Sequence, residues 1–250
     1  MILKELKINT WIGDPTNCYI IFEEKSKEII VIDPAGDVDK IEEIIHILGG
    51  NLKYIYLTHC HADHILGVME LKRRCNGKIL IHREDADGLN DPNINLSPYI
   101  GVGNITLDAA SSRVDDKDLV HLGELQFEVI HTPGHTKGST SLYCKQENCL
   151  FSGDTLFRGT WGRTDLPTSS FENIINSIVK KLMILPDETI VYPGHGMMTM
   201  IKDEKPIYLE LKPKLFLEEV YMDPKKYQEI EEEIQELEAQ LNELMMNWDE

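Results

Sequence analysis

The chain has 250 residues, and its 43 aspartates and glutamates outnumber its 25 lysines and arginines, which gives a formal net charge of −18. This length allows one large α/β domain, or a core domain with a small appendage. The negative charge would repel nucleic-acid phosphates and anionic lipid surfaces, so we expect neither as a partner. No apolar stretch is long enough to span a bilayer and the first residues do not resemble a signal peptide, so we expect a cytoplasmic protein.

The cysteine pattern argues against two further kinds of site. The five cysteines are scattered and form no CxxC pair. This disfavours a disulfide framework and a metal site built from thiolates. We therefore expect most of them to be small buried apolar residues.

The first part of the chain predicts alternating strands and helices. Strand patterns cover Ile2–Ile8, Cys18–Phe22, Ile29–Ile32, Lys53–Thr58 and Lys78–His82, and helical patterns cover Val38–Leu48 and Ile65–Arg74. From Arg83 to Lys117 the sequence is polar and rich in turn residues, which predicts a short helix followed by long surface loops. Several strands within Asp118–Phe151, a helix over Phe171–Leu185 and a strand over Thr189–Tyr192 predict a second αβ half.

The end of the chain has a different pattern. After an amphipathic stretch at Pro206–Tyr221, apolar residues recur at alternating spacings of four and three, namely Ile230, Ile234, Leu237, Leu241 and Leu244. This helix could form a coiled coil between copies and so make a homo-oligomer, or it could dock on its own domain. We therefore divide the chain into a domain of residues 1–200 and a C-terminal helical extension of residues 201–250.

A dense group of potential metal ligands follows the strand pattern at Lys53–Thr58. Within six residues it contains His59, His61, Asp63 and His64. Imidazoles and carboxylates are ligands that Zn²⁺ takes from proteins, and residues two apart at a strand end point the same way. A solvated polar loop is the competing interpretation, which four such residues directly after an apolar strand disfavour. The side chain of Cys60 should point to the opposite face of the extended chain from those of His59 and His61, so it is not counted as a ligand.

Three later turns share one local pattern. In each, an apolar strand leads into a glycine-bearing turn that presents one ligand-type side chain: His135, Asp154 and His195. A scaffold can aim ligands from several strand ends into one cleft in this way. Taken singly, either histidine would be an ordinary turn residue.

The sequence around the remaining candidate residues gives weaker evidence for a place in a metal site. Asp33, which precedes a proline, is either a turn residue or a support for a metal ligand. His131 lies next to the His135 turn and could also be such a support, but we assign it a structural role. We expect the same of the other histidines, which lack a strand-then-turn setting: His46, His82 and His121.

Together these residues resemble the metallo-β-lactamase fold superfamily. Its HxHxDH motif is met by the run from His59 to His64, and its later His, Asp and His match His135, Asp154 and His195. The local sequences at Gly153–Phe157 and Pro133–Thr136 are most similar to those of the glyoxalase II group, the hydroxyacylglutathione hydrolases. The resemblance covers roughly residues 1 to 200 and implies a four-layer αβ/βα sandwich.

The resemblance also implies a binuclear metal centre. One ion would be held by His59, His61 and His135, a second by Asp63, His64 and His195, and Asp154 would bridge them. Zinc is the expected ion, with iron or manganese as alternatives. The implied activity is cleavage of a small thioester by a metal-bridging hydroxide, with Asp63 orienting the hydroxide and Asp154 holding both ions.

Substrate recognition departs from the glyoxalase II pattern. Arg163 falls where that group carries a basic substrate-binding residue, although a surface salt bridge is the competing interpretation. Met197 and Asp165 stand where tyrosines that hold glutathione would be expected, and the tail Asp223–Glu250 is acidic. The pattern therefore leaves open which thiol the substrate carries.

Two other functions remain as alternatives. A persulfide dioxygenase would share the fold and a stretch like Gly162–Asp165, but would use a single iron held by His59, His135 and Asp154. A non-catalytic binding protein could keep the metal for structure alone. The complete set of ligand-type residues disfavours the second alternative.

Overall fold

The computed structural model describes residues 1–10, 15–107, 112–211, 225, 228–236 and 239, and within them the chain forms two six-stranded sheets. The first sheet has the order β1 (Ile2–Ile8), β2 (Thr16–Glu23), β3 (Glu28–Ile32), β4 (Asn51–Tyr56), β5 (Lys78–His82) and β6 (Ser112–Val114). The second has the order β12 (Thr199–Met200), β11 (Ile190–Pro193), β10 (Cys149–Gly153), β9 (Thr140–Cys144), β8 (Leu125–His131) and β7 (Leu119–Leu122).

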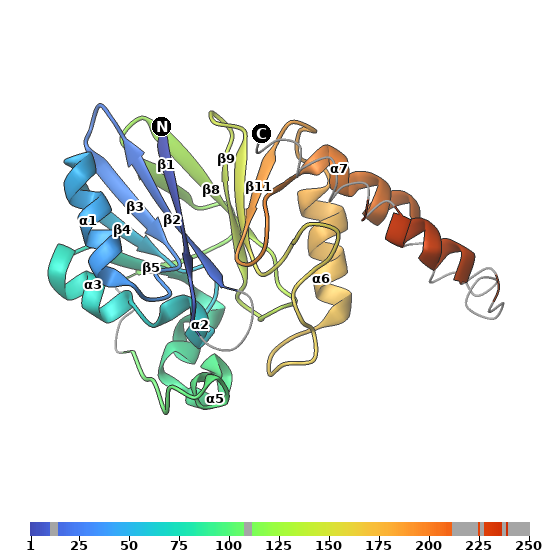
Figure 1. Cartoon of the computed structure of the whole chain (residues 1–250), viewed down its shortest axis with the longest axis horizontal. Coiled ribbons are helices and arrows are strands. Elements are labelled where there is room, and N and C mark those ends of the chain that lie inside the picture. Colours follow the sequence, from blue (N-terminus) through green and yellow to red (C-terminus); the bar gives the residue numbers. More distant parts are fainter. Residues whose placement is uncertain (11–14, 108–111, 212–224, 226–227, 237–238, 240–250) are drawn as a thin grey trace.

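Helices cover the outer face of each sheet (Figure 1). On the first sheet these are α1 (Val38–Leu48) and α3 (Val68–Cys75). On the second they are α6 (Phe171–Ser177), η3 (Ile178–Leu182), α7 (Ile201–Lys205) and η4 (Pro206–Leu211). Shorter helices follow the strands of the first sheet, namely α2 (Ala62–Ile65), α4 (Arg83–Ala86), η1 (Asp87–Asn90), α5 (Pro92–Asn95) and η2 (Ser97–Ile100).

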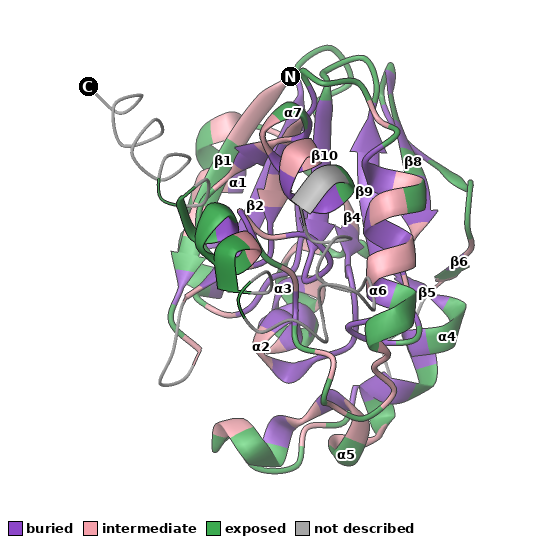
Figure 2. Cartoon of the chain, turned by 90° about the vertical axis from the view of Figure 1, so that its right-hand side faces the viewer, coloured by how far each residue is buried: buried purple, intermediate pink, exposed green. Residues whose placement is uncertain are grey.

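Apolar side chains fill the space between these layers. Along β3, Ile29 and Val31 pack toward the helices, whereas Ile30 and Ile32 pack toward the second sheet. A strand buried on both faces must be apolar at every position, which explains the continuous apolar runs of the sequence. The strands are accordingly the most buried part of the molecule (Figure 2). Helix, sheet, sheet and helix layers thus stack in order, which confirms the four-layer αβ/βα sandwich.

Strand direction sets where the loops meet. Strands β3, β4, β5 and β6 run parallel in the first sheet. In the second sheet β10 and β11 are parallel, and β8 runs with them because β9 is antiparallel to both β8 and β10. The carboxyl ends of these strands therefore lie at the same edge of their sheet, where ligands commonly bind in α/β folds.

Several predicted elements differ in extent. The helix predicted over Ile65–Arg74 is two helices, α2 and α3, because the Gly67 N–H donates to the carbonyl oxygen of Pro34 at 2.8 Å instead of continuing one helix. Within the described residues between Arg83 and Lys117, the chain forms four short helices and β6, where the sequence predicted one short helix followed by loops. The helix predicted over Phe171–Leu185 ends at Leu182, and β12 had no prediction.

Some residues after 200 pack against the second sheet. Ile201, Ile207 and Tyr208 are buried in the apolar layer between this sheet and its helices. The division of the chain into residues 1–200 and 201–250 stays a prediction. Of the heptad positions, Ile230 and Ile234 lie in a helical segment at 228–236, while Leu237, Leu241 and Leu244 lie outside the described residues. Homo-oligomer formation through this helix stays a prediction.

No helix among the described residues is both long and apolar enough to cross a membrane.

Candidate metal centre

The seven residues predicted as ligands all follow strands at one edge of the sandwich. The run His59–His64 comes after β4, and its last residues form α2, with His61 at the position that precedes the helix. His135 follows β8, Asp154 follows β10 and His195 follows β11. Parallel strand direction thus brings together residues that are far apart in the sequence.

Three imidazoles form what we call the inner triad: His59, His61 and His135. One ring nitrogen of each lies within 4.8 Å of the others, and all three residues are buried. His61 Nδ1 and His135 Nε2 are 2.9 Å apart. Three imidazoles that converge in this way can together bind one divalent metal ion.

A second group, the outer triad, consists of Asp63, His64 and His195. Their ligand atoms also lie within 4.8 Å of one another. His64 Nε2 is 3.2 Å from His195 Nε2, which is 3.4 Å from Asp63 Oδ2. The Asp63 and His195 side chains are 19% and 17% exposed, so this triad opens toward solvent while the inner triad does not.

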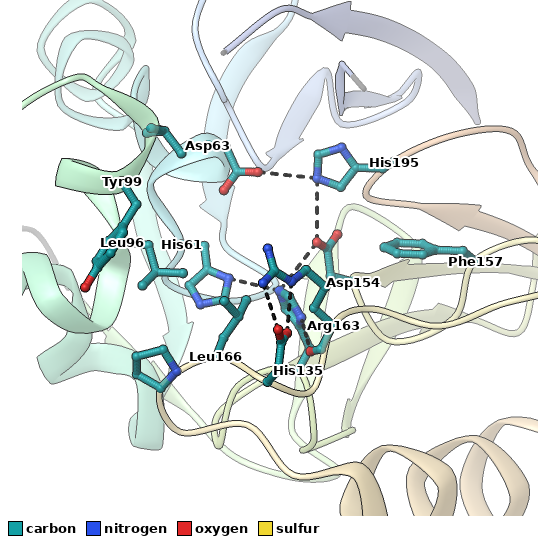
Figure 3. A pocket seen from close by; sticks show the side chains of 13 residues that line it. His61, Asp63, Leu96, Tyr99, His135, Asp154, Phe157, Arg163, Leu166 and His195 are labelled. Carbon is teal, nitrogen blue, oxygen red and sulfur yellow. Dashed lines mark hydrogen bonds and ion pairs between the residues drawn. The ribbon is translucent and has the colours of Figure 1, made fainter. Parts of the chain in front are cut away.

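Asp154 lies between the two triads (Figure 3). Its carboxylate oxygens are 3.5 Å from His135 Nε2 of the inner triad, and 3.5 and 3.6 Å from His64 Nε2 and His195 Nε2 of the outer triad. The turn before His195 comes close to this carboxylate, because a Cβ at Gly194 would collide with Asp154 Oδ1 and lie 2.8 Å from His64 Cε1. A glycine is therefore needed at this position.

The donor atoms of this centre fit a pair of cations. His59 Nε2, His61 Nε2 and Asp154 Oδ1 are buried and have no hydrogen-bond partner among the described residues. Buried polar atoms are normally paired, since leaving one unpaired costs roughly 1–3 kcal/mol. Imidazole and carboxylate donors around such atoms suit zinc, iron or manganese. The chain therefore carries a His/Asp metal-binding centre for divalent ions.

Hydrogen bonds on the far side of the rings orient the imidazoles. His135 Nδ1 donates to the carbonyl oxygen of Arg163 at 2.9 Å, and His195 Nδ1 donates to that of Pro15 at 3.1 Å. Such bonds fix the tautomer and leave Nε2 free to act as a ligand.

Asp33 does the same for His64. Its carboxylate is 2.9 Å from His64 Nδ1 and also accepts from the backbone N–H and hydroxyl of Thr58 at 2.8 and 2.7 Å. Its backbone has a positive φ of 49° at the end of β3. Of the two interpretations left open by the sequence, the contact with His64 favours Asp33 as a support for a metal ligand.

Electrostatics differ between the triads. Burial, together with the nearby His135, lowers the pKa of His61 to about 3, and burial likewise lowers the pKa of His59. Burial opposes charge on His64 as well, but the carboxylates of Asp154 and Asp63 outweigh it and raise the pKa of His64. The pKa of Asp63 falls to about 2 because His64 and His195 outweigh the effect of burial.

A cavity of about 610 Å³ opens onto the centre. Residues of both triads and Asp154 line it, together with the apolar side chains of Leu96, Tyr99, Ile100, Phe157, Leu166 and Pro167. Leu96 and Tyr99 lie on the side of His61, whereas Phe157 lies beside His195, with the two ring centroids 6.1 Å apart (Figure 3). A cavity of this size suits a small molecule. These apolar residues were not predicted individually, because no local pattern in the sequence marks any of them as facing a site.

Arg163 also lines this cavity. Its Nε and Nη2 atoms donate to the two carboxylate oxygens of Asp165 at 2.9 and 2.8 Å, and both side chains are largely exposed. The salt-bridge interpretation therefore holds, although an exposed pair is worth only about 0–1 kcal/mol and leaves Arg163 able to change partner. Met197 is 40% exposed and does not line the cavity.

The remaining candidates lie outside the two triads. Cys60 is buried in the apolar layer between the first sheet and its helices. His131 stacks on His82 with ring centroids 4.0 Å apart, and its Nε2 donates to the carbonyl oxygen of Lys137. His131 and His82 therefore contact each other and their own loops, and neither belongs to a group that could hold a metal.

The fold and the centre define the class of protein. A family model described as the metallo-beta-lactamase superfamily matches residues 11–195, so the chain belongs to this superfamily. It is 34% identical over 190 residues to the hydroxyacylglutathione hydrolase GloC of Haemophilus influenzae, a match that covers 76% of this chain and 89% of that protein. The chain is thus a glyoxalase II-like metallo-hydrolase of the superfamily.

Solved structures agree with this placement. The crystal structure of the BLEG-1 B3 metallo-beta-lactamase superposes with a TM-score of 0.77 at 32% identity, over 83% of this chain and 100% of that one. ETHE1 from Myxococcus xanthus superposes with a TM-score of 0.70 at 27% identity, over 93% of this chain and 90% of that one. The shared fold therefore extends over most of the described residues.

Proposed function

We propose that this protein is a binuclear metal-dependent hydrolase that cleaves a small thioester. The observation that carries the proposal is the arrangement of two triads on either side of Asp154, with buried donor atoms that have no hydrogen-bond partner among the described residues. His59, His61 and His135 would hold one ion, and Asp63, His64 and His195 the other, with Asp154 shared. The similarity to GloC supports the choice of a thioester over other carbonyl substrates.

The residues of the centre have distinct tasks in this reaction. When bound, two divalent ions acidify a water so that it can act as the nucleophile near neutral pH, and they offer positive charge to a carbonyl oxygen. Asp63 is partly open to the cavity, so its carboxylate can orient the attacking water by accepting a hydrogen bond. The thiol that leaves has a pKa near about 8.5 and needs little help from a general acid.

The cavity wall would bind the rest of the substrate. Its apolar side chains, including Tyr99 and Phe157, offer contact area for the acyl or thiol part. Arg163 would attract a carboxylate or peptide group if it exchanges its bond to Asp165 for one to the substrate. The proposed partner is thus a small molecule, and we propose that the reaction takes place in the cytoplasm.

Metal quantification paired with an activity panel tests the proposal. We expect two zinc ions per chain, hydrolysis of at least one acyl thioester, loss of this activity on chelation and its return with zinc. An alanine variant of the exposed His46 should behave like the wild type, whereas an alanine variant of His61 should lose metal and activity together. One iron per chain with oxygen uptake on a persulfide would instead identify the dioxygenase, and metal binding without either activity would identify a binding protein.

A further inference from the structure

A buried carboxylate outside the two triads connects the loops that carry the inner triad. Asp85 lies on α4, directly after β5, and is only 1% exposed. One of its oxygens, Oδ2, accepts from the backbone N–H of Cys60 at 3.1 Å and from the hydroxyl of Thr136 at 2.6 Å. The other, Oδ1, accepts from the backbone N–H of Gly138 at 2.7 Å. All three donors therefore converge on one side chain.

Two of these three donors belong to residues next to inner-triad ligands in the sequence. Cys60 lies between His59 and His61, and Thr136 directly follows His135. The two loops come from different sheets and are separated by 74 positions in the sequence, yet His61 and His135 must both face a common ion, and His61 Nδ1 lies 2.9 Å from His135 Nε2. A carboxylate bonded to both loops sets the distance between them, as hydrogen bonds behind metal ligands commonly do.

Close packing leaves little freedom in this arrangement. A Cβ on Gly138 would lie 2.5 Å from both the backbone nitrogen and Oδ1 of Asp85. Thr136 is also bonded to Ser139, whose Oγ lies 2.8 Å from its hydroxyl. The His135 loop is therefore fixed against α4 by backbone approach as well as by hydrogen bonds.

The outer triad is held by other groups. His64 is bonded to Asp33, and His195 donates to the carbonyl oxygen of Pro15. Within the run His59–His64 the Asp85 carboxylate is bonded at Cys60, between the two inner-triad histidines, and among the described residues none of its hydrogen bonds reaches the loop of His195. We propose that Asp85 is a positioning residue for the inner metal site alone, an inference that rests on the proposed binuclear function.

Replacement of Asp85 by asparagine tests this proposal. Asparagine has one acceptor oxygen and one donating NH₂ group, so it cannot accept from all three donors in the same way. Titration of the metal-free protein with Co²⁺, followed by visible absorption, reports the occupancy of each site without relying on activity. Alanine variants of His135 and His195 assign the spectra, because each removes a ligand from one triad.

We expect Asp85→Asn to weaken Co²⁺ binding at the inner site by about 10- to 100-fold and to leave the outer site unchanged. The matched control is Asp87→Asn, two positions along the same segment, where the carboxylate is exposed and paired with Arg113. If Asp85→Asn does not fold, Thr136→Val removes one of the three bonds with little change of volume and carries the same expectation.

Two results would overturn the inference. Wild-type affinity for Co²⁺ at both sites of Asp85→Asn would mean that Asp85 does not position the inner ligands. An equal loss of Co²⁺ affinity at both sites, together with a lower melting temperature, would mean that Asp85 has a general structural role. A wild-type protein that binds no metal would contradict the proposed function itself, so the two failures can be distinguished.

Discussion

The inner and outer triads use the same kind of side chain in opposite electrostatic settings. The inner triad has three buried imidazoles and no carboxylate, and burial keeps the pKa of His61 at about 3. The outer triad includes Asp63 and opens to the cavity, and the carboxylates around His64 raise its pKa although burial opposes this. Near neutral pH the inner imidazoles of His59 and His61 are thus ready to accept a cation, whereas an ion entering the outer triad must displace protons.

Removing the group that both triads share should have the largest effect. Asp154→Asn takes away a negative charge near His64, His135 and His195, so we expect the affinity for both ions to fall. The rate of thioester hydrolysis should drop by about 100-fold or more, because several kcal/mol of charge stabilisation depend on the ions. Metal content and kcat measured on the same sample check this. Full activity in the variant would show that Asp154 does not serve either ion, and Asp187→Asn, an exposed carboxylate paired with Lys205, is the control.

Removing the hydrogen bond that orients one imidazole should change the metal affinity of the two sites to different extents. Asp33→Asn weakens the hydrogen bond to His64 Nδ1, and we expect a loss of about 10- to 100-fold in affinity at the outer site. The loss at the inner site should be smaller, because Asp33 reaches His59 only through Thr58, whose hydroxyl lies 3.0 Å from His59 Nδ1. Co²⁺ titration followed by visible absorption measures both sites. This variant is the counterpart of Asp85→Asn, and equal effects on both sites would remove the distinction between the triads.

Changing the pH should reveal the same difference without mutation. The pKa values of His64 and His195 are raised by Asp154 and Asp63 despite burial, so both groups hold protons more strongly than a free imidazole does. As the pH falls from 8 to 6, affinity at the outer site should decrease by up to about tenfold per pH unit for each proton displaced. The inner site should change less, because His59 and His61 are already neutral in this range. Isothermal titration with zinc at several pH values would measure both slopes, and identical slopes would contradict the expectation.

The smallest effect should come from Arg163, a cavity residue that is not among the predicted ligands. Arg163→Ala removes a cation that is exposed and already paired with Asp165, so we expect KM for a carboxylate-bearing thioester to rise by less than about tenfold at unchanged kcat. For a thioester without a charged group KM should stay the same. A large fall in kcat would show instead that Arg163 contacts the reacting atoms.

Sequence patterns predicted the metal-ligand residues of the site better than the residues that surround them. The run from His59 to His64 is recognisable because four ligand types follow one apolar strand, and the two-sheet fold follows from continuous apolar strands. Asp85 and Tyr99 could not be recognised, because they lie in a polar, turn-rich region where no local period marks a residue that faces a site. Their roles depend on parallel strand ends that meet only in the folded chain.

The close approach of Gly194 to Asp154 limits how this protein can change its substrate. Any larger residue there would move a carboxylate that serves both triads, so variation at that turn would damage catalysis before it altered specificity. The part of the cavity lined by Leu96, Tyr99 and Leu166 contributes none of the seven predicted ligands, and Tyr99 is 74% exposed. A library intended to redirect the protein to new substrates would therefore succeed most readily at these residues, with Gly194 left unchanged.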